Sequence, residues 1–253
     1  MSTAMLLTLA AALMVGLALG GLGGGGSILT VPVLIYLAGV DPKPAIAMSL
    51  VVVGVTAAVA LIPHARAGRV HWRTGLLFGG FGMAGAYAGG RIAAFVPANV
   101  LLAGFAVMML VTAVAMLRPN RTAAPAAAAV HRRPLAKIAI EGAAVGLITG
   151  LVGAGGGFLV VPALVLLGGL SMPAAVGTSL LVISLKSGAA LAGYLHSVAI
   201  DWPLTLSVTA LAVAGSLIGA RLAGRADPGA LRRGFGWFVI VMGLGVLTGQ
   251  LLA

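Results

Sequence analysis

Long apolar runs fill almost the whole chain, and short polar stretches separate them. We delimit eight apolar segments: residues 4–38, 44–63, 74–95, 98–117, 137–169, 173–195, 203–224 and 230–252. A helix that crosses a bilayer needs about 20 mostly apolar residues, so every segment is long enough to span a membrane. The pattern predicts an all-α membrane protein. The first and fifth segments are too long for one simple helix.

The composition excludes a water-soluble globule. Hydrophobic residues make up 61% and charged residues 8% of the 253 residues, and the mean hydropathy is +1.18. Soluble domains average about 45–50% apolar and about 25% charged residues. With no cysteine and four histidines, the chain offers little material for a metal or redox centre, and it shows no carboxylate pair or catalytic triad. We therefore expect no cofactor, no metal and no enzyme activity.

The chain contains an internal repeat without gaps. The glycine-rich stretch Gly20–Pro32 returns as Gly150–Pro162, at an offset of 130 residues. The same offset relates Ser49 to Ser179, Trp72 to Trp202, Gly85 to Gly215, and Arg91 to Arg221. The repeat predicts two homologous four-segment membrane repeats, residues 1–117 and 137–253, with a cytoplasmic linker at 118–136. Two such halves are the usual construction of secondary transporters, although a duplicated bundle can also be an inert scaffold.

The basic residues indicate how the halves are oriented. Fifteen Lys and Arg against four Asp and Glu give a formal charge of +11, and nearly all basic residues lie between apolar segments, as in membrane proteins rather than nucleic-acid-binding proteins. If every segment crossed once, the two faces would carry eight and six basic residues. If the first and fifth segments turn back at their glycine clusters, one face collects twelve, and only Lys43 and Arg91 lie opposite. By the positive-inside rule we predict inverted repeats, re-entrant first segments, cytoplasmic basic loops and both termini outside.

Two glycine clusters within the longest segments are the first candidate binding site. They consist of Gly24, Gly25 and Gly26, followed by Ser27, in the first half and of Gly155, Gly156 and Gly157 in the second half. Each glycine costs a helix interior about 1 kcal/mol relative to alanine, and broken backbone at membrane depth is tolerated where protein covers it or where it lines a cavity. The helix that starts after each break would direct free amide groups at an anion. The alternative is close helix packing through small residues.

Hydroxyl side chains near the starts of the second and sixth segments are a second candidate site. Ser49 in the first half corresponds to Ser179 in the second half, where Thr178 precedes it. Thr30 follows the first glycine cluster, although its repeat counterpart is Val160. We interpret these hydroxyls as donors to an anionic substrate. The alternative is that they bond to helix backbone, as membrane Ser and Thr often do.

Lys186 is the strongest single candidate for a binding residue because it lies within the sixth apolar segment. A charge inside a membrane span costs at least about 2.5 kcal/mol and is normally paired or functional. Its repeat counterpart is Thr56, and Ser184 and Ser187 are near it in sequence. We predict that Lys186 holds an anionic substrate or changes its protonation state during transport. The alternatives are snorkelling to the interface and an ion pair with Glu141.

Histidines and tryptophans mark several segment ends. His64 and His196 flank the inner ends of the second and sixth segments and are displaced by two positions in the repeat. They fit either a proton relay or, as we favour, ordinary bridging between headgroups and water. Trp72 and Trp202 are typical of interfacial anchors.

The paired motifs Gly20–Pro32 and Gly150–Pro162, with Ser49 and Thr178–Ser179 downstream, resemble those of the sulfite exporter TauE/SafE family over nearly the whole chain. The resemblance implies a bacterial inner-membrane permease with two homologous halves, associated with export or uptake of sulfite, sulfonates and other small anions. One departure is Ala154, which interrupts the second glycine run.

These observations predict a secondary transporter of small sulfur-containing anions, such as sulfite, thiosulfate or a sulfonate, that works by alternating access across the bacterial inner membrane. Its expected partners are the anionic substrate, the lipid bilayer and protons as a coupling ion, and not nucleic acid. The membrane potential is the other energy source, since no ATP-binding motif is present. A homodimer is compatible with the sequence. The alternatives are a passive anion channel and a non-transporting membrane scaffold.

Overall fold

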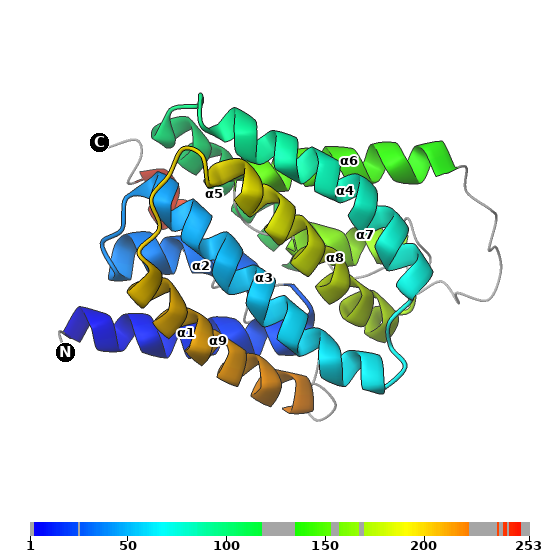
Figure 1. Ribbon diagram of the computed structural model, residues 1–253. Helices are drawn as coiled ribbons and strands as arrows, with labels where there is room; N and C mark the ends of the chain where they lie inside the picture. The colour runs from blue at the N-terminus through cyan, green and yellow to red at the C-terminus, as the bar shows by residue number, and fades with distance from the viewer. Residues whose placement is uncertain are drawn as a thin grey trace.

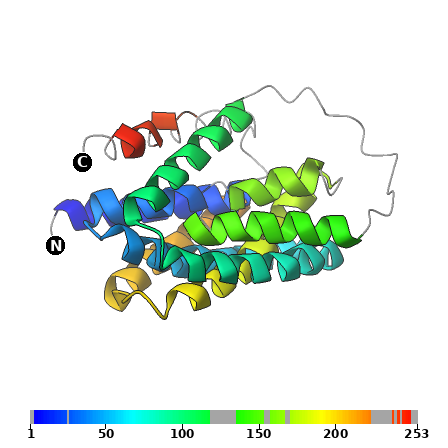
Figure 2. The ribbon, with the colours of Figure 1, turned by 90° about the horizontal axis from the view of Figure 1, so that it is seen from above.

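A computed structural model describes residues 3–24, 26–117, 135–152, 157–166 and 170–222, together with 237, 240–241 and 243–248. These residues form helices and their connections and contain no strand, which confirms the all-α prediction. The helices are α1 Thr3–Leu22, α2 Ser27–Pro32, the π-helix η1 Val33–Leu37, α3 Pro42–Arg66, α4 Trp72–Ala93, α5 Ala98–Leu117, α6 Leu135–Val152, α7 Gly157–Leu166, α8 Met172–Tyr194 and α9 Trp202–Leu222. Most lie side by side along one long direction (Figure 1), and α5 crosses them obliquely (Figure 2).

The helices follow the predicted segments wherever the structure describes them. The single-helix segments 44–63, 74–95, 98–117, 173–195 and 203–224 correspond to α3, α4, α5, α8 and α9. The long segments are divided, 4–38 into α1, α2 and η1, and 137–169 into α6 and α7. Within the described residues, α3, α8, α9 and the part Thr3–Gly21 of α1 are long and apolar enough to cross a membrane. The predicted linker 118–136 lies outside the described residues except for its last two positions, which belong to α6, and the segment 230–252 is described only in part.

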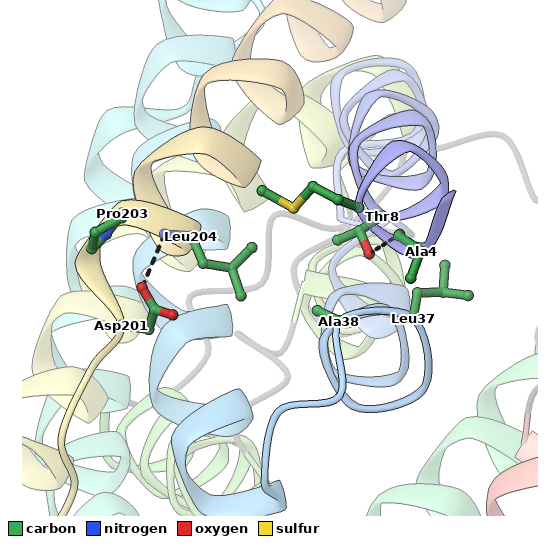
Figure 3. A pocket seen from close by; sticks show the side chains of 8 residues that line it. Ala4, Thr8, Leu37, Ala38, Asp201, Pro203 and Leu204 are labelled. Carbon is green, nitrogen blue, oxygen red and sulfur yellow. Dashed lines mark hydrogen bonds between the residues drawn. The ribbon is translucent and has the colours of Figure 1, made fainter. Parts of the chain in front are cut away.

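The first apolar segment breaks at its glycine cluster, and the chain turns back. Gly23 and Gly24 have φ angles of 73° and 155°, in the region that side chains disfavour and glycine tolerates. After the break the chain packs against the helix it has just left, since a Cβ on Gly26 would lie 2.2 Å from a backbone oxygen of α1. At the end of η1 the chain has returned to the start of α1, because Leu37 lines the same cavity as Ala4 (Figure 3). A re-entrant path in a membrane stays a prediction.

Two parallel helix pairs are held together by glycines that touch the opposite backbone. Between α1 and α9, a Cβ on Gly16 would lie 2.0 Å from the Ala212 carbonyl oxygen, and a Cβ on Gly20 would lie equally close to that of Ser216. The repeat counterparts between α6 and α4 are Gly146 against Gly82 and Gly150 against Ala86. Small residues that let backbones approach closely are typical of helix pairs in membranes.

These pairs exchange helices between the two halves of the sequence. Helix α1 of the first half packs on α9 of the second half, and α6 of the second half packs on α4 of the first. We call α1, α3 and α9 the first bundle and α4, α6 and α8 the second bundle. Their apolar interiors are related by the repeat. The first contains Leu34, Ala45, Val52 and Val208, and the second contains Leu164, Ala175, Val182 and Phe78 at the corresponding positions.

The two bundles are joined by α3 and α8, which are repeat counterparts. Gly54 in the middle part of α3 faces Ser187 in the middle part of α8. The start of α8 lies beside the loop that follows α3, where the backbone N–H of His71 donates to the Thr178 hydroxyl at 3.0 Å. Helices α3 and α8 therefore run in opposite directions (Figure 1).

Most of the described basic residues lie at the ends of the bundles, and Lys186 is an exception. Arg69, in the α3–α4 loop, and Ala220, near the end of α9, line one cavity, so this loop and the end of α9 lie together. At the opposite end the Lys43 ammonium donates to the Ala94 carbonyl oxygen at 3.0 Å, just past the end of α4. The first end carries Arg66, Arg69, Arg73 and Arg221, and the other end carries Lys43 and Arg91.

Candidate functional site

The glycine break of the first half lies against the start of α8 from the second half. The Ser179 hydroxyl is placed to donate to the carbonyl oxygen of Gly23 and, at 2.7 Å, to that of Val176 in its own helix. A Cβ on Gly23 would lie 2.6 Å from the Val176 side chain, so only glycine leaves room for this approach. The predicted binding residues that the fold gathers around this break are Gly24, Gly26, Ser27 and Ser179.

The hydroxyls around this break already bond to backbone carbonyls. Ser27 directs both its hydroxyl, at 2.8 Å, and its backbone N–H, at 3.2 Å, to the Gly24 oxygen. The Leu29 N–H donates to the Gly26 oxygen at 3.1 Å. Farther away, the Ser49 hydroxyl donates to a carbonyl of its own helix at 2.7 Å. This is the backbone-bonding arrangement that was the alternative for these residues, and anion binding by them stays a prediction.

The second glycine cluster is only partly described. Gly25 of the first cluster and Gly155 and Gly156 of the second lie outside the described residues, and Gly157 begins α7. Helices α2 and α7, which follow the two breaks, contact each other. The two broken segments therefore meet inside the protein, although the geometry of the second break is not part of the described structure.

Five buried side chains carry a polar atom that has no hydrogen-bond partner within the described part of the chain. They are Thr30, Thr56, His64 at its Nδ1 atom, Lys186 and Ser187. A buried donor or acceptor without a partner costs roughly 1–3 kcal/mol, so such atoms mark places where water or a ligand completes the bonding. Thr30 and Lys186 are among the predicted binding residues. Thr56 and Ser187 are not, because a uniformly apolar helix does not reveal which of its hydroxyls are buried.

Lys186 is enclosed by the second bundle, and 1% of its surface is exposed. It lies near the middle of α8, about 21 Å from the start and about 12 Å from the end at 1.5 Å per residue. A Cβ on Gly82 of α4 would lie 2.9 Å from the Lys186 Cδ and 3.4 Å from the Gly142 carbonyl oxygen of α6. The ammonium group has no hydrogen-bond partner in the described residues, so it forms neither an exposed snorkelling contact nor a hydrogen bond with Glu141.

The predicted binding residues form separate groups along the molecule. Lys186 follows Ser179 by seven residues, which is about 10 Å along α8. Ser49 lies near the start of α3, and because α3 and α8 run in opposite directions, it lies toward the other end of the molecule from Ser179. The glycine break with Ser179 is thus one group, Lys186 lies deeper, and Ser49 is apart from both.

His64 is a functional candidate whose environment the sequence did not show. It is 3% exposed, and its Nε2 atom lies 3.2 Å from the Gly20 carbonyl oxygen of α1. In the second half Tyr194, at the position related to His64 by the repeat, makes a similar bond: its hydroxyl donates at 2.6 Å to the carbonyl oxygen of Leu151, which follows the counterpart of Gly20 in α6. The structural counterpart of His64 is therefore Tyr194, while His196 is exposed in the turn after α8. Burial does not fit our favoured interpretation that His64 bridges headgroups and water.

Comparison with known proteins identifies the kind of protein that has this arrangement. The model of the family described as sulfite exporter TauE/SafE matches residues 8–246. The chain belongs to the TauE/SafE family. A probable membrane transporter protein of Xylella fastidiosa (strain Temecula1) is 34% identical over 250 residues, which cover 96% of this chain and 95% of that protein. The probable membrane transporter protein YdhB of Bacillus subtilis (strain 168) is 27% identical over 211 residues, which cover 82% of this chain and 86% of that protein. No solved structure matches the chain.

Membership of the TauE/SafE family confirms the resemblance seen in the paired glycine motifs. The family and the names of the relatives indicate a membrane transporter rather than an enzyme. The long apolar helices agree with a multi-pass membrane protein.

Proposed function

We propose that this TauE/SafE protein is a secondary transporter of small sulfur-containing anions, such as sulfite, thiosulfate or a sulfonate, in the bacterial inner membrane. The observation that carries the proposal is Lys186, a buried cation in the middle of a helix long enough to span a membrane, without a hydrogen-bond partner in the described residues. An unpaired charge at that depth is costly and is normally found where a substrate, an ion or a proton is handled.

An anion is the ligand that this environment favours. A negative charge beside the Lys186 ammonium would offset the cost of its burial, whereas a cation or a neutral solute would not. The aliphatic part of the Lys186 side chain lies against Gly82. Because glycine has no side chain, this part of the lysine lies close to the backbone of α4. The family description names sulfite, which is an anion and so agrees in the sign of its charge with a substrate for a buried ammonium group.

Alternating access is supported by the division of the molecule into two bundles. Within each bundle, glycines bring helix backbones into direct contact, so these pairs move most readily as units. Between the bundles, Gly54 of α3 faces a side-chain atom of α8, because a Cβ there would lie 3.1 Å from the Ser187 Cβ and near no backbone atom of α8. We infer that the bundles, and not the two halves of the sequence, rock against each other along α3 and α8. Protons or the membrane potential would drive the cycle.

Inverted repeats are also part of the proposal. Three observations support them: the opposite directions of α3 and α8, the reversal of the chain after the first glycine break, and the gathering of arginines at one end. Lys43 and Arg91 lie at the other end. By the positive-inside rule the arginine-rich end faces the cytoplasm.

Single cysteines test this orientation directly, because the natural chain has no cysteine. His71→Cys places a thiol in the α3–α4 loop, and Phe95→Cys places one in the α4–α5 loop, where Phe95 is 86% exposed. A membrane-impermeant thiol reagent added to intact cells is expected to label Phe95→Cys and not His71→Cys. Inside-out vesicles should give the reverse. Labelling of both variants from the same side would contradict the topology.

Flux into proteoliposomes tests the proposed function. We expect saturable uptake of sulfite, thiosulfate or methanesulfonate by vesicles that contain the protein, and none by vesicles without it, with a rate that depends on the imposed proton gradient or membrane potential. Flux that neither saturates nor responds to a proton gradient would favour a passive channel. The absence of both flux and binding for all three anions would refute the proposal.

A further inference from the structure

A small cavity opens at the arginine-rich end, where α3 and α9 finish. It has a volume of about 120 Å³ and is lined by Pro63, His64, Ala67, Arg69 and Ala220. A cavity of this volume holds several water molecules. It is therefore large enough for an anion of four or five heavy atoms. The cavity lies apart from Lys186, which is in the middle of the second bundle.

The hydrogen bonding of His64 leaves one ring nitrogen available. The Gly20 carbonyl oxygen, 3.2 Å from Nε2, can only accept, so Nε2 must carry the hydrogen. In the neutral ring Nδ1 is then an acceptor, and it is buried without a partner in the described residues. Arg69 lines the same cavity as His64, and its guanidinium group offers donors only. One acceptor and one cationic donor group complement a ligand that carries both an O–H group and a negative charge.

We propose that this cavity binds a monoprotonated oxyanion such as hydrogensulfite, and that His64 accepts its proton. The ligand donates its O–H to Nδ1 of His64 and presents its charged oxygens to Arg69. In the transfer the ligand O–H bond breaks and an Nδ1–H bond forms, which leaves an imidazolium beside a dianion with no change in oxidation state. The inference rests on the proposed function in taking the transported anion as the ligand.

The charges around His64 fit this assignment. Arg66 lies in the same helix turn, Arg69 lines the cavity, and Arg221 follows Ala220 in α9. Helix α1, which supplies the Gly20 carbonyl, carries no charged residue. In the described part of these elements the only carboxylates, those of Asp41 and Asp201, precede the starts of α3 and α9, at the other end. The bound dianion would thus supply the negative charge that balances an imidazolium among arginines, at the end of α3 where the helix dipole also favours a cation.

The opposite end of the molecule lacks this chemistry at the corresponding positions. Tyr194 takes the place of His64, and its hydroxyl donates a hydrogen bond to the Leu151 carbonyl oxygen. Ala199 takes the place of Arg69. A proton-accepting anion site at one of two repeat-related positions makes the two ends of the molecule chemically different, because substrate is deprotonated on the arginine-rich side.

Nitrogen NMR of the full-length protein tests the inference without measuring transport. The chain has only four histidines, so ¹⁵N-histidine labelling gives few signals. The signal that disappears in the His64→Gln variant is assigned to His64. We expect the free protein to show the neutral Nε2–H tautomer. Sodium sulfite near neutral pH should shift the Nδ1 signal to that of a protonated ring, whereas methanesulfonate, which has no proton to give, should not.

Binding measurements on matched variants complete the test. Glutamine at position 64 keeps a donor for the Gly20 carbonyl but cannot take up a proton, so His64→Gln should weaken sulfite binding at this cavity about tenfold or more and leave methanesulfonate binding unchanged. Arg69→Gln should weaken the binding of both anions. The control His196→Gln alters an exposed histidine and should change neither.

The outcomes separate this inference from the proposed function. Saturable sulfite flux with an unchanged His64 signal would overturn the inference and leave the proposed function standing. A sulfite-dependent His64 signal in a protein that transports none of the anions would support the cavity as a binding site and overturn the proposed function. An equal response of His64 to sulfite and to methanesulfonate would overturn the proton transfer.

Discussion

Gly85→Ala is expected to break the contact between α4 and α6 and to abolish the folded protein, while Gly80→Ala in the same helix is tolerated. A Cβ at position 85 would lie 2.0 Å from the Ala143 carbonyl oxygen and 2.8 Å from the Leu147 backbone nitrogen. Because both atoms belong to backbone, no side-chain rotation relieves the clash, and the two helices must move apart. The cost should reach or exceed about 3 kcal/mol, the upper end of ordinary overpacking.

Gly80 is a matched control. A Cβ at that position meets nothing within 4 Å, and alanine is a better helix former by about 1 kcal/mol. The measurement is the fraction of monodisperse protein after purification in detergent, together with the thermal unfolding midpoint. The repeat-related contact between α9 and α1 predicts the same loss for Gly215→Ala, whose Cβ would lie 2.2 Å from the Leu13 carbonyl oxygen. Equal stability of Gly85→Ala and Gly80→Ala would contradict this packing.

Lys186→Met is expected to abolish anion transport and at the same time to stabilise the protein. Methionine keeps the length of the side chain and removes the charge. The substrate loses its buried counter-charge, so the flux should fall by about 100-fold or more. In the empty protein the ammonium is buried without a hydrogen-bond partner in the described residues, and its removal should raise the free energy of unfolding by roughly 2 kcal/mol.

The two opposite effects distinguish transport from a purely structural role. The control is Lys43→Met, which removes a lysine that donates to the Ala94 carbonyl oxygen at one end of the molecule and should leave the flux unchanged. The measurements are anion flux in proteoliposomes and denaturant-induced unfolding of the same preparations. A scaffold would show a change in stability or assembly alone. A destabilised Lys186→Met variant would indicate instead that the ammonium holds a structural ion pair.

The positions of the helices were predictable because apolar length and glycine content act locally. Segment 98–117 coincides with α5, and the other single-helix segments differ from their helices by a few residues. The break in the first segment is located by Gly23 and Gly24, whose φ angles of 73° and 155° suit glycine. Lys186 was identifiable for a similar reason, since one charge in an apolar span is conspicuous wherever the helix packs.

The candidate site was less predictable because burial and partners depend on how helices face each other. Ser179 appeared as a hydroxyl for an anion, but in the structure it holds the Gly23 carbonyl of the other half. Ser187 was noted only as a neighbour of Lys186, yet it is buried against Gly54, and its hydroxyl has no hydrogen-bond partner among the described residues. His64 looked like a boundary residue, and its burial and its contact with Gly20 became visible only in the fold.

The sequence by itself predicted apolar helices in two repeated sets, a glycine break in the first segment and a lysine within an apolar segment. Only the tertiary structure decided that the sets exchange helices, so that Gly16 meets Ala212 and Gly146 meets Gly82. The physical reason is that lipid and protein interior are equally apolar, so the hydrophobic pattern does not mark which helix face packs. The chain has 39 glycines, and only the folded backbone shows which of them contact the backbone of another helix.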